Sequence, residues 1–183
     1  MPAADSIERI NALLALYRES HYDVELPDGE TATIRVSAPL PEPIVHWIGR
    51  EGVAVYMTAC NPYSQSLPAA ENELRLERLR ERLRERGCAF LEGAGHVPGE
   101  NWREPSLLVR GIDESVVDAL VHEYDQNAVL MVRSLAGPVM RIYRPDWKAE
   151  IGAADDIEWV HPQHIQGGLQ PTGRAPGGLK PTL

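Results

Sequence analysis

The sequence predicts an α+β fold, with a single domain built on the ferredoxin-like, or split βαβ, order of elements and a mixed sheet. Two observations support this class. Apolar runs of strand length and two helical patterns follow one another as strand, helix, strand, strand, helix, strand over residues 53–134. The chain also has 183 residues, 43% of them hydrophobic, which is enough for one buried core. We place the domain at residues 1–146 and a C-terminal extension at residues 147–183.

An N-terminal helix and a hairpin are expected before the central unit. Residues 6–22 (SIERINALLALYRESHY) carry apolar side chains at helical spacing, behind a serine suited to capping. Two alternating runs, YDVEL at 22–26 and ATIRVS at 32–37, flank the turn sequence PDGET, which predicts a β-hairpin. A short helix is expected to begin at Pro43 and end at Gly49, because proline suits the first turn and glycine the end.

The central unit begins with VAVYMTA at 53–59, a nearly continuous apolar run as expected for a strand buried on both faces. A long, strongly charged helix, AAENELRLERLRERLRERG, follows and ends at Gly87. The remaining expected elements are the strand CAFLEGAG at 88–95, the strand SLLVRGI at 106–112, the helix DESVVDALVHEYDQ at 113–126, the strand AVLMVRS at 128–134 and the strand VMRIYR at 139–144.

The composition changes after Arg144. The segment GGLQPT at 167–172 recurs as GGLKPT at 177–182, in a stretch rich in glycine and proline and poor in aliphatic residues. Such a composition buries too little apolar surface to fold by itself. We therefore expect a Gly/Pro-rich tail, extended or disordered from about residue 161.

The charge and the motifs argue against several classes of function. A net charge of −9 and a pI near 5.1 disfavour a nucleic-acid partner and an anionic membrane surface. No apolar run approaches the roughly 20 residues of a membrane span, and the N-terminus lacks the pattern of a secretory signal, so we expect a cytoplasmic protein. The histidines show no metal-ligand spacing and no cofactor motif stands out, so neither a metal nor a cofactor is expected.

The two cysteines, Cys60 and Cys88, are too few for a disulfide framework. They fall at opposite ends of the long charged helix, separated by roughly a helix length at about 1.5 Å per residue. A bridge needs Cα atoms within about 7 Å of each other, so we predict two free thiols.

The direction of the chain brings three polar segments to one end of the expected sheet, which we call the polar edge. The loop CNPYSQSLPAAEN at 60–72 follows the first strand of the central unit, and HVPGENWREP at 96–105 follows the second. Gln126 and Asn127 directly precede the last strand of the unit. Because hairpins and helical crossovers fix the direction of each strand in this order, all three segments meet at the same end.

Glu71 and Asn72 enter the charged helix at the polar edge. Asn72 shares a helix face with apolar leucines, so its amide points along the buried stripe and needs a partner there. Glu71 stands in the first turn, where the helix dipole favours a carboxylate. Either residue can also be purely structural: Glu71 by pairing with Arg75, and Asn72 by tying the loop to Gln126 or Asn127.

The motifs at the polar edge resemble those of an uncharacterised bacterial family, the domain of unknown function 3293 (DUF3293). The similarity covers about residues 17–144, and its combination of Asn-Pro-x-Ser, Glu-Asn, Trp-x-Glu-x-Ser and Gln-Asn is fairly specific. The resemblance implies no established activity. Cys60 replaces a frequent aromatic residue of the family, and Pro105 replaces a frequent glutamate. The recurrent polar positions correspond here to Asn61, Ser64, Glu71, Asn72, Glu104, Ser106, Gln126 and Asn127.

We expect the polar edge to bind a polar or anionic small molecule, because a helix entry offers free N–H groups to a ligand. Glu71 and Glu104 are the candidates for acid–base catalysis, while Tyr63 and Trp102 can stack on a planar group. No nucleophile with a positioned base stands out, so the sequence leaves open whether the protein is an enzyme. The ligand-binding candidates are Asn61, Tyr63, Ser64, Gln65, Glu71, Asn72, Trp102, Glu104, Ser106, Gln126 and Asn127.

A protein-interaction or regulatory module is the alternative. In that case the polar edge is an internal brace of hydrogen bonds, and the repeated C-terminal tail binds a protein partner. The two hypotheses differ in geometry. A brace closes on itself through bonds among its amide side chains, whereas a site leaves an opening lined by Glu71, Glu104 and Trp102.

Overall fold

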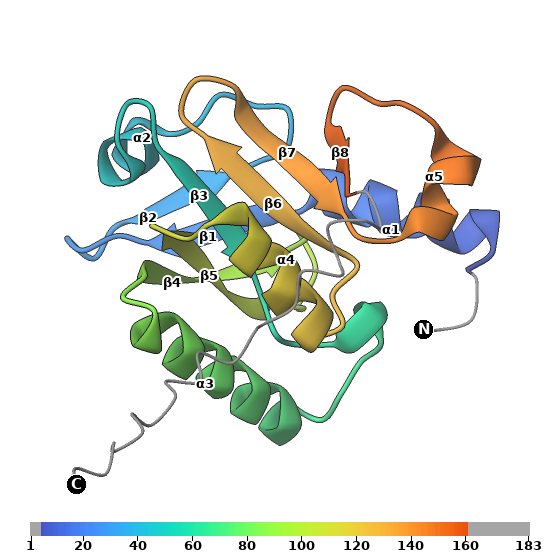
Figure 1. The fold of residues 1–183 in the computed structure, drawn as a ribbon, viewed down its shortest axis with the longest axis horizontal. Helices are drawn as coiled ribbons and strands as arrows, with labels where there is room; N and C mark the ends of the chain where they lie inside the picture. Colours follow the sequence, from blue (N-terminus) through green and yellow to red (C-terminus); the bar gives the residue numbers. More distant parts are fainter. Residues whose placement is uncertain (1–4, 161–183) are drawn as a thin grey trace, which may run out of the picture.

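The computed structural model describes residues 5–160, which form one curled sheet of eight strands with five α-helices (Figure 1). The α+β class predicted from the sequence is therefore confirmed. The helices are α1 (Ile7–Glu19), α2 (Glu42–Ile48), α3 (Ala69–Glu85), α4 (Glu114–Glu123) and α5 (Pro145–Ile151). The strands are β1 (His21–Glu25), β2 (Thr31–Ile34), β3 (Val53–Met57), β4 (Ala89–His96), β5 (Glu104–Arg110), β6 (Ala128–Arg133), β7 (Gly137–Ile142) and β8 (Ile157–Trp159), and the short 3₁₀ turn η1 (Pro62–Ser64) follows β3.

The ends of the helices follow from local sequence. Ser6 caps α1, because its side chain accepts a hydrogen bond from Arg9 N at 3.3 Å. α3 stops just before Gly87, whose φ of 68° is left-handed and which few other residues would tolerate there. Cys88 N then reaches back to Leu83 O at 3.0 Å, which satisfies a carbonyl in the last turn.

The strands lie in the order β2-β1-β4-β5-β3-β6-β7-β8. β3 pairs with β5 and with β6, and β4 pairs with β5, all antiparallel. The predicted N-terminal hairpin is confirmed, since β1 pairs antiparallel with β2 and places Val24 opposite Ala32. Only the pairing of β7 with β8 is parallel among the described strands.

The two faces of the sheet pack against different helices. β3 is buried on both faces, as its apolar run predicts. Val55 and Met57 pack in a core cluster with residues of α3 and α4, while Ala54 and Tyr56 pack in a second cluster with residues of α1, α2 and α5. Figure 1 shows α3 and α4 on one side of the sheet and α1 on the other. We call these the α3/α4 face and the α1 face.

Two elements, α5 and β8, have no counterpart among the sequence-based predictions. Trp147 of α5 is fully buried in the core, and β8 extends the sheet beside β7. Residues 147–160, assigned from the sequence to a C-terminal extension, therefore pack against the sheet. The Gly/Pro-rich repeat at 167–182 lies outside the described residues.

Both cysteines are free and buried, as predicted. Cys60 lies after β3, and Cys88 lies between α3 and β4. Within residues 5–160, no helix combines the length and the apolar character that crossing a bilayer requires.

Candidate functional site

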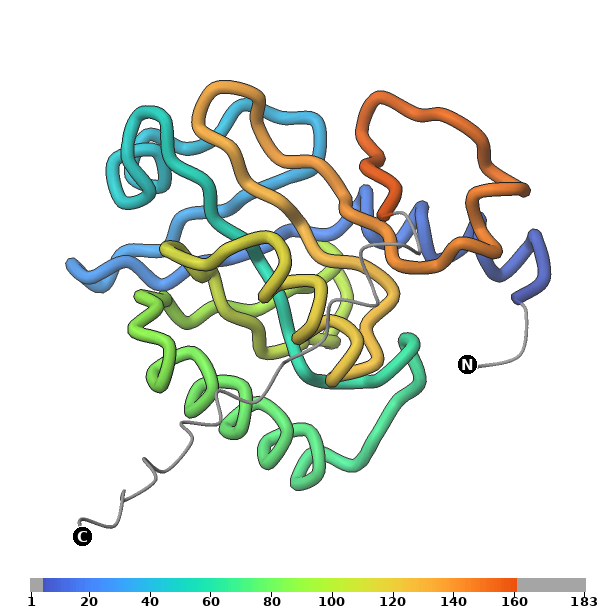
Figure 2. Tube along the Cα trace, in the orientation of Figure 1, coloured from blue at the N-terminus to red at the C-terminus, as the bar shows by residue number. Residues whose placement is uncertain are grey.

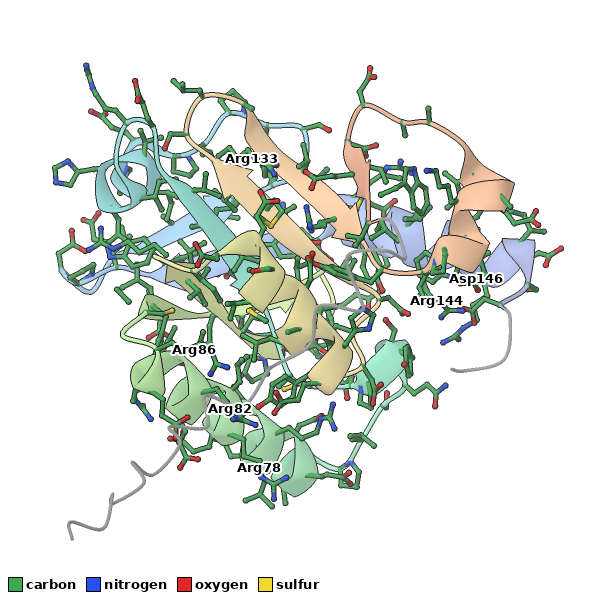
Figure 3. The ribbon with its side chains drawn as sticks, in the orientation of Figure 1. Arg78, Arg82, Arg86, Arg133, Arg144 and Asp146 are labelled. Atoms are coloured by element: carbon green, nitrogen blue, oxygen red, sulfur yellow. The ribbon has the colours of Figure 1, made fainter. Side chains whose placement is uncertain are left out.

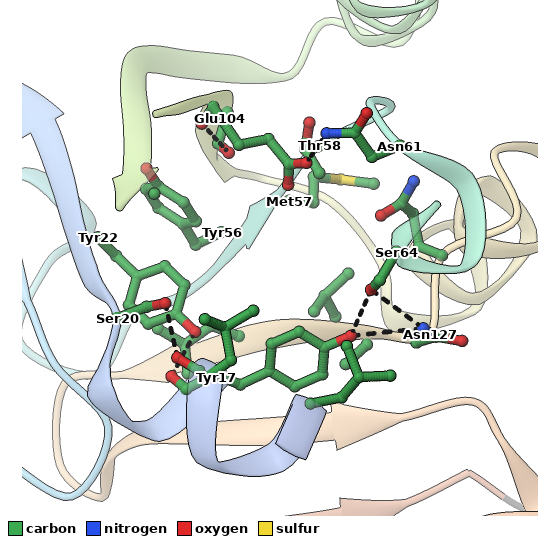
Figure 4. Close-up of a pocket in the computed structure, with 18 of the residues that line it drawn as sticks. Tyr17, Ser20, Tyr22, Tyr56, Met57, Thr58, Asn61, Ser64, Glu104 and Asn127 are labelled. Atoms are coloured by element: carbon green, nitrogen blue, oxygen red, sulfur yellow. Dashed lines mark hydrogen bonds between the residues drawn. The ribbon is translucent and has the colours of Figure 1, made fainter. Parts of the chain in front are cut away.

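A cavity of about 280 Å³ lies between α1 and the sheet (Figure 4). Leu13 and Tyr17 of α1 form part of one wall, and Tyr56 of β3 forms part of the opposite wall. The cavity reaches the polar edge at Asn61 and Glu104. It therefore lies mainly on the α1 face, across the sheet from the helix whose entry first suggested a site.

The turn after β3 shapes the polar end of the cavity. Asn61, Tyr63 and Ser64 have φ angles of 47°, 50° and 55°, in the left-handed region that non-glycine residues rarely adopt. Tyr63 N donates to Asp125 O at 2.6 Å, and its hydroxyl donates to Asp125 Oδ1 at 2.8 Å. Asp125 is itself left-handed, with φ of 56°. Figure 2 traces the two segments that these hydrogen bonds join, one after β3 and one before β6. Left-handed backbone conformations of non-glycine residues are strained, and such strain concentrates at functional sites.

A reciprocal amide pair fixes Asn61. Asn61 N donates to Asn72 Oδ1 at 2.9 Å, and Asn72 Nδ2 donates to Asn61 Oδ1 at 2.8 Å. Leu67 N also donates to Asn61 Oδ1, at 3.0 Å. Because its oxygen is occupied, Asn61 directs its Nδ2 to Glu104 Oε2, at 2.5 Å. Asn72 is half-buried and has the partner that its place beside the apolar stripe required, but that partner is Asn61 and not Gln126 or Asn127.

Glu104 begins β5, and its carboxyl lines the cavity (Figure 4). Burial raises the pKa of Glu104 to about 7, and the hydrogen bond from Asn61 opposes that rise. Within the described part of the chain, no Arg, Lys or His lines the cavity. Arg103, the preceding residue, pairs with Asp23 at 3.0 Å. The carboxyl can therefore take up or release a proton near neutral pH.

A second network ties α1 to the polar edge. The buried Arg144 donates from Nη1 to Asn127 Oδ1 at 3.1 Å, which leaves Asn127 Nδ2 facing Ser64 Oγ at 3.2 Å and Tyr17 OH at 3.4 Å. Ser64 Oγ and Tyr17 OH are themselves 2.8 Å apart. Arg144 is held in turn by Asp146, at 2.6 Å (Figure 3). This chain of contacts fixes the position of Tyr17 in the cavity wall.

The structure brings most of the predicted site residues to this cavity and leaves four away from it. Gln65 and Glu71 have exposed side chains, in the loop and in the first turn of α3. Asn72 acts behind Asn61, and Tyr63 is held by Asp125. The predicted residues that line the cavity are Asn61, Ser64, Trp102, Glu104, Ser106, Gln126 and Asn127.

The polar edge is both braced and open. The amide pair is closed on itself, and Gln126 Nε2 donates to Cys60 O at 2.8 Å. Next to this brace lies the cavity, with Glu104 in its wall and Trp102, 41% exposed, at its rim. Glu71 forms no ion pair among residues 5–160, and Arg75 instead donates to the backbone oxygens of Ala59 and Tyr124. Of the three side chains expected at the opening, two are there.

Three tyrosines of the cavity wall have no counterpart among the predicted site residues: Tyr17, Tyr22 and Tyr56. The rings of Tyr22 and Tyr56 meet edge to face, with centroids 5.2 Å apart. The amphipathic pattern of the first helix did place Tyr17 on its buried face. It carried no information on which face of the sheet that helix covers, and so the tyrosines could not be assigned to a common wall.

Cys60 is a poor nucleophile in this setting. Its Sγ lies 3.8 Å from the backbone oxygens of both Asn72 and Pro105, and burial raises the pKa of its thiol. His96, the last residue of β4, contacts Asp23 at 3.0 Å. Among residues 5–160, no group of three or more His, Cys, Asp or Glu side chains is arranged to hold a metal ion.

Comparison with known families gives one match. The family model described as "Protein of unknown function (DUF3293)" matches residues 57–129. That range includes the turn after β3, all of α3 and Glu104. No curated protein and no solved structure matches the chain. The resemblance predicted from the motifs is therefore confirmed over residues 57–129.

Proposed function

We propose that this protein binds a small polar molecule in the cavity between α1 and the sheet, with Glu104 and Asn61 at the centre of recognition. The observation that carries the proposal is the Glu104 carboxyl. Within residues 5–160 it lines a cavity and accepts one side-chain hydrogen bond, from Asn61 at 2.5 Å. Buried polar groups are normally satisfied, so a desolvated carboxyl with further lone pairs available marks a place for a ligand.

The size and walls of the cavity support a small ligand. Its volume of about 280 Å³ is just below the roughly 300–1,000 Å³ of most ligand clefts. Leu13 and Leu16 of α1, with Leu130 and Met140 of the sheet, supply apolar contact. The amide and carboxyl groups gather at the polar edge, with Asn61, Glu104 and Asn127. This combination of apolar walls and a few convergent polar groups is typical of a binding pocket.

The charges of the cavity wall favour only part of the ligand class expected from the sequence. An anionic molecule would be repelled by the Glu104 carboxylate, because no Arg, Lys or His of the described chain lines the wall to offset that charge. A polar ligand able to donate hydrogen bonds faces no such repulsion. Glu104 is also the one lining group with a pKa near neutrality on this wall, about 7, so proton transfer is the chemistry that the site would support if it is catalytic.

The order of strands supports the more detailed fold assignment. β3, α3, β4, β5, α4 and β6 follow one another in the split βαβ order, and their strands lie as β4-β5-β3-β6 in an antiparallel arrangement. We infer a ferredoxin-like unit extended by two strands on each side. In this arrangement both helices of the unit lie on the face opposite the cavity, and α1 covers the other face.

The interaction hypothesis depends on the repeat at 167–182, which lies outside the described residues. It stays a prediction, as does the cytoplasmic location of a bacterial protein. No feature of residues 5–160 adds to either.

Ligand-induced thermal shifts of the full chain across a broad metabolite set test the proposed function. We expect some metabolites to raise the melting temperature. This shift should be lost in Leu13→Trp, because the larger side chain fills the cavity from α1, and it should be smaller in Glu104→Gln. Glu100→Gln is the matched control, because Glu100 is an exposed glutamate of the neighbouring loop and does not line the cavity. Circular dichroism shows whether each variant is folded. Hits that bind both cavity variants as tightly as the native protein would contradict the proposal.

A further inference from the structure

Hydroxyl groups of the cavity wall donate their protons to the protein itself. Tyr22 OH donates to Tyr17 O at 2.7 Å, and Tyr56 OH donates to Asp23 O at 3.0 Å. Ser20 Oγ likewise donates to Leu16 O at 2.7 Å. A hydroxyl has one proton and two lone pairs. Each of these groups can therefore offer a ligand only an acceptor.

The polar edge shows the same pattern. Thr58 Oγ1 donates to Pro105 O at 2.8 Å, and Ser106 Oγ donates to Glu104 O at 3.1 Å. Gln126 Nε2 donates to the backbone oxygens of Cys60 and Tyr124, at 2.8 and 3.1 Å. Asn61 Nδ2 donates to Glu104. The donors of this wall are largely engaged, and lone pairs remain.

The contact between the hydroxyl groups of Tyr17 and Ser64 leaves one donor available to a ligand. Tyr17 OH and Ser64 Oγ lie 2.8 Å apart and both accept from Asn127 Nδ2, so one of the two hydroxyl protons lies between them and the other is free. Ser66 and Trp102 are exposed at the rim. The inner wall thus has at most one free hydroxyl proton, beside many lone pairs and one carboxyl.

The charge and the aromatic rings favour a cation. Among residues 5–160, Glu104 has the only carboxyl group that lines the cavity, and no basic side chain lines it. Tyr22 and Tyr56 meet edge to face, which leaves ring surface beside the cavity. Aromatic faces attract ammonium groups, and a carboxylate strengthens hydrogen bonds from a charged donor.

We propose that the ligand of this cavity is a protonated amine, whose N–H groups donate to the Glu104 carboxylate and to the tyrosine hydroxyl oxygens while its carbon skeleton contacts the leucines of α1. This inference rests on the proposed function, because it names the class of ligand for the same cavity. An ammonium group supplies three donors and no acceptor. That is the complement of a wall whose own donors are engaged.

A proton balance follows from this assignment. Burial raises the pKa of Glu104 to about 7, so the free carboxyl is partly protonated at neutral pH. An ammonium ion favours the ionised carboxylate, so binding at pH 7 releases part of a proton to solvent, and affinity rises between pH 6 and 8. Around Glu104, burial raises the pKa values of Tyr17, Tyr22 and Cys60, which keeps these groups protonated in that range.

Besides Arg144 and Asp146 behind Asn127, the Asp23 cluster is a charged group near this end of the cavity. Asp23 contacts His96 and Arg103, both at 3.0 Å. Burial raises the pKa of Asp23, but the hydrogen bonds from Thr33 and Arg103 outweigh it and hold this pKa below its usual value. Neither His96 nor Asp23 lines the cavity. His96→Gln therefore separates any titration of this cluster from that of Glu104.

Isothermal titration calorimetry with matched probes tests the proposal. The probes are 2-phenylethylamine, 2-phenylethanol and phenylacetate, together with butylamine, butanol and butyrate, titrated into the full chain at pH 8. We expect each amine to bind roughly tenfold or more tightly than its alcohol, and each carboxylate to bind weakest. Glu104→Gln removes the charge at nearly constant size and should bring the amine and alcohol affinities together. Glu100→Gln and His96→Gln should keep the difference.

Titrations at pH 7 in two buffers of different ionisation enthalpy give the proton release. We expect release in the native protein and in His96→Gln, and none in Glu104→Gln. If alcohols or carboxylates bind as tightly as amines, and Leu13→Trp abolishes their binding, the amine assignment is wrong. The proposed binding function would then still hold. If no probe and no metabolite binds in a manner sensitive to Leu13→Trp, both proposals fail.

Discussion

Two carboxyl groups, a half-buried one and a buried one, border cavities of similar volume, and their surroundings differ. Glu104 borders the cavity of about 280 Å³ under α1, and Asp118 of α4 borders one of about 270 Å³ beside β7 and β8. Asp118 accepts hydrogen bonds from Arg141 Nε at 3.0 Å, from Arg141 Nη2 at 2.9 Å and from Tyr143 OH at 2.6 Å. Within residues 5–160, the Glu104 carboxylate accepts one side-chain hydrogen bond, from Asn61.

The difference separates a packing gap from a candidate binding site. Arg141 also pairs with Glu114 and Glu158, so the charges around Asp118 are compensated by the protein. Glu104 has no cation of the described chain in its cavity. Both cavities are large enough for a small ligand, so volume alone does not distinguish them. The distinguishing property is hydrogen-bonding capacity that the protein leaves unused.

The largest effect is expected from Arg141→Met, which leaves Asp118 buried with Tyr143 as its remaining donor. Removing one partner of a buried ion pair typically costs about 3–5 kcal/mol, because the other charge stays desolvated. We expect a loss of this size in the free energy of unfolding, measured by urea denaturation at pH 7. The double variant Arg141→Met with Asp118→Leu should recover most of it, because both charges are then gone.

Arg133→Met is the matched control for this prediction. Arg133 is half-buried on β6 (Figure 3) and pairs with Glu114 and Glu158, both of them partly exposed. Exposed ion pairs contribute about 0–1 kcal/mol, so this variant should lose little. Equal losses for Arg133→Met and Arg141→Met would mean that Asp118 is not the compensated acid described above.

A smaller effect with the opposite sign is expected for Glu104. Its pKa rises from an ordinary 4.5 to about 7 on folding, so its stability contribution is fully present below about 4.5 and is lost as the pH rises through about 7. Relative to the native protein, Glu104→Gln should therefore gain up to about 3 kcal/mol between these limits. Urea denaturation of both proteins at pH 5 and pH 8 measures this change, with Glu100→Gln as control. A constant difference between the two proteins would show that Glu104 is not desolvated.

The convergence of Asn61, Glu104 and Asn127 at one edge could be predicted from chain direction alone. Apolar runs and a glycine-terminated helix fix where each strand begins and ends, so the polar segments between them have one place to meet. The same reasoning predicted that Asn72 needed a partner. It did not identify Asn61 as that partner, because the left-handed turn at residues 61–64 contains no glycine from which it could be predicted.

The position of the cavity could not be predicted, for a different physical reason. Periodicity shows that the first helix has an apolar face, but not which face of a sheet it covers, since that depends on contacts across the whole domain. Tyr17 and Tyr56 therefore gave no sign of a shared wall. The strand β8 was missed because three residues carry no periodic pattern and because its position depends on pairing with β7.

The smallest effect is expected from Glu71→Gln, the other acid proposed from the sequence as a catalytic candidate. Glu71 is exposed in the first turn of α3, without an ion pair within residues 5–160 and away from the cavity. Its contribution is then limited to its interaction with the helix dipole, worth about 0.3–1 kcal/mol at low salt and less when screened. Urea denaturation in low and high salt measures that loss. A loss well above this range, or one that salt does not reduce, would group Glu71 with Glu104 and Asp118. The exposure and ion pairs of a carboxyl group would then not predict its contribution to stability in this fold.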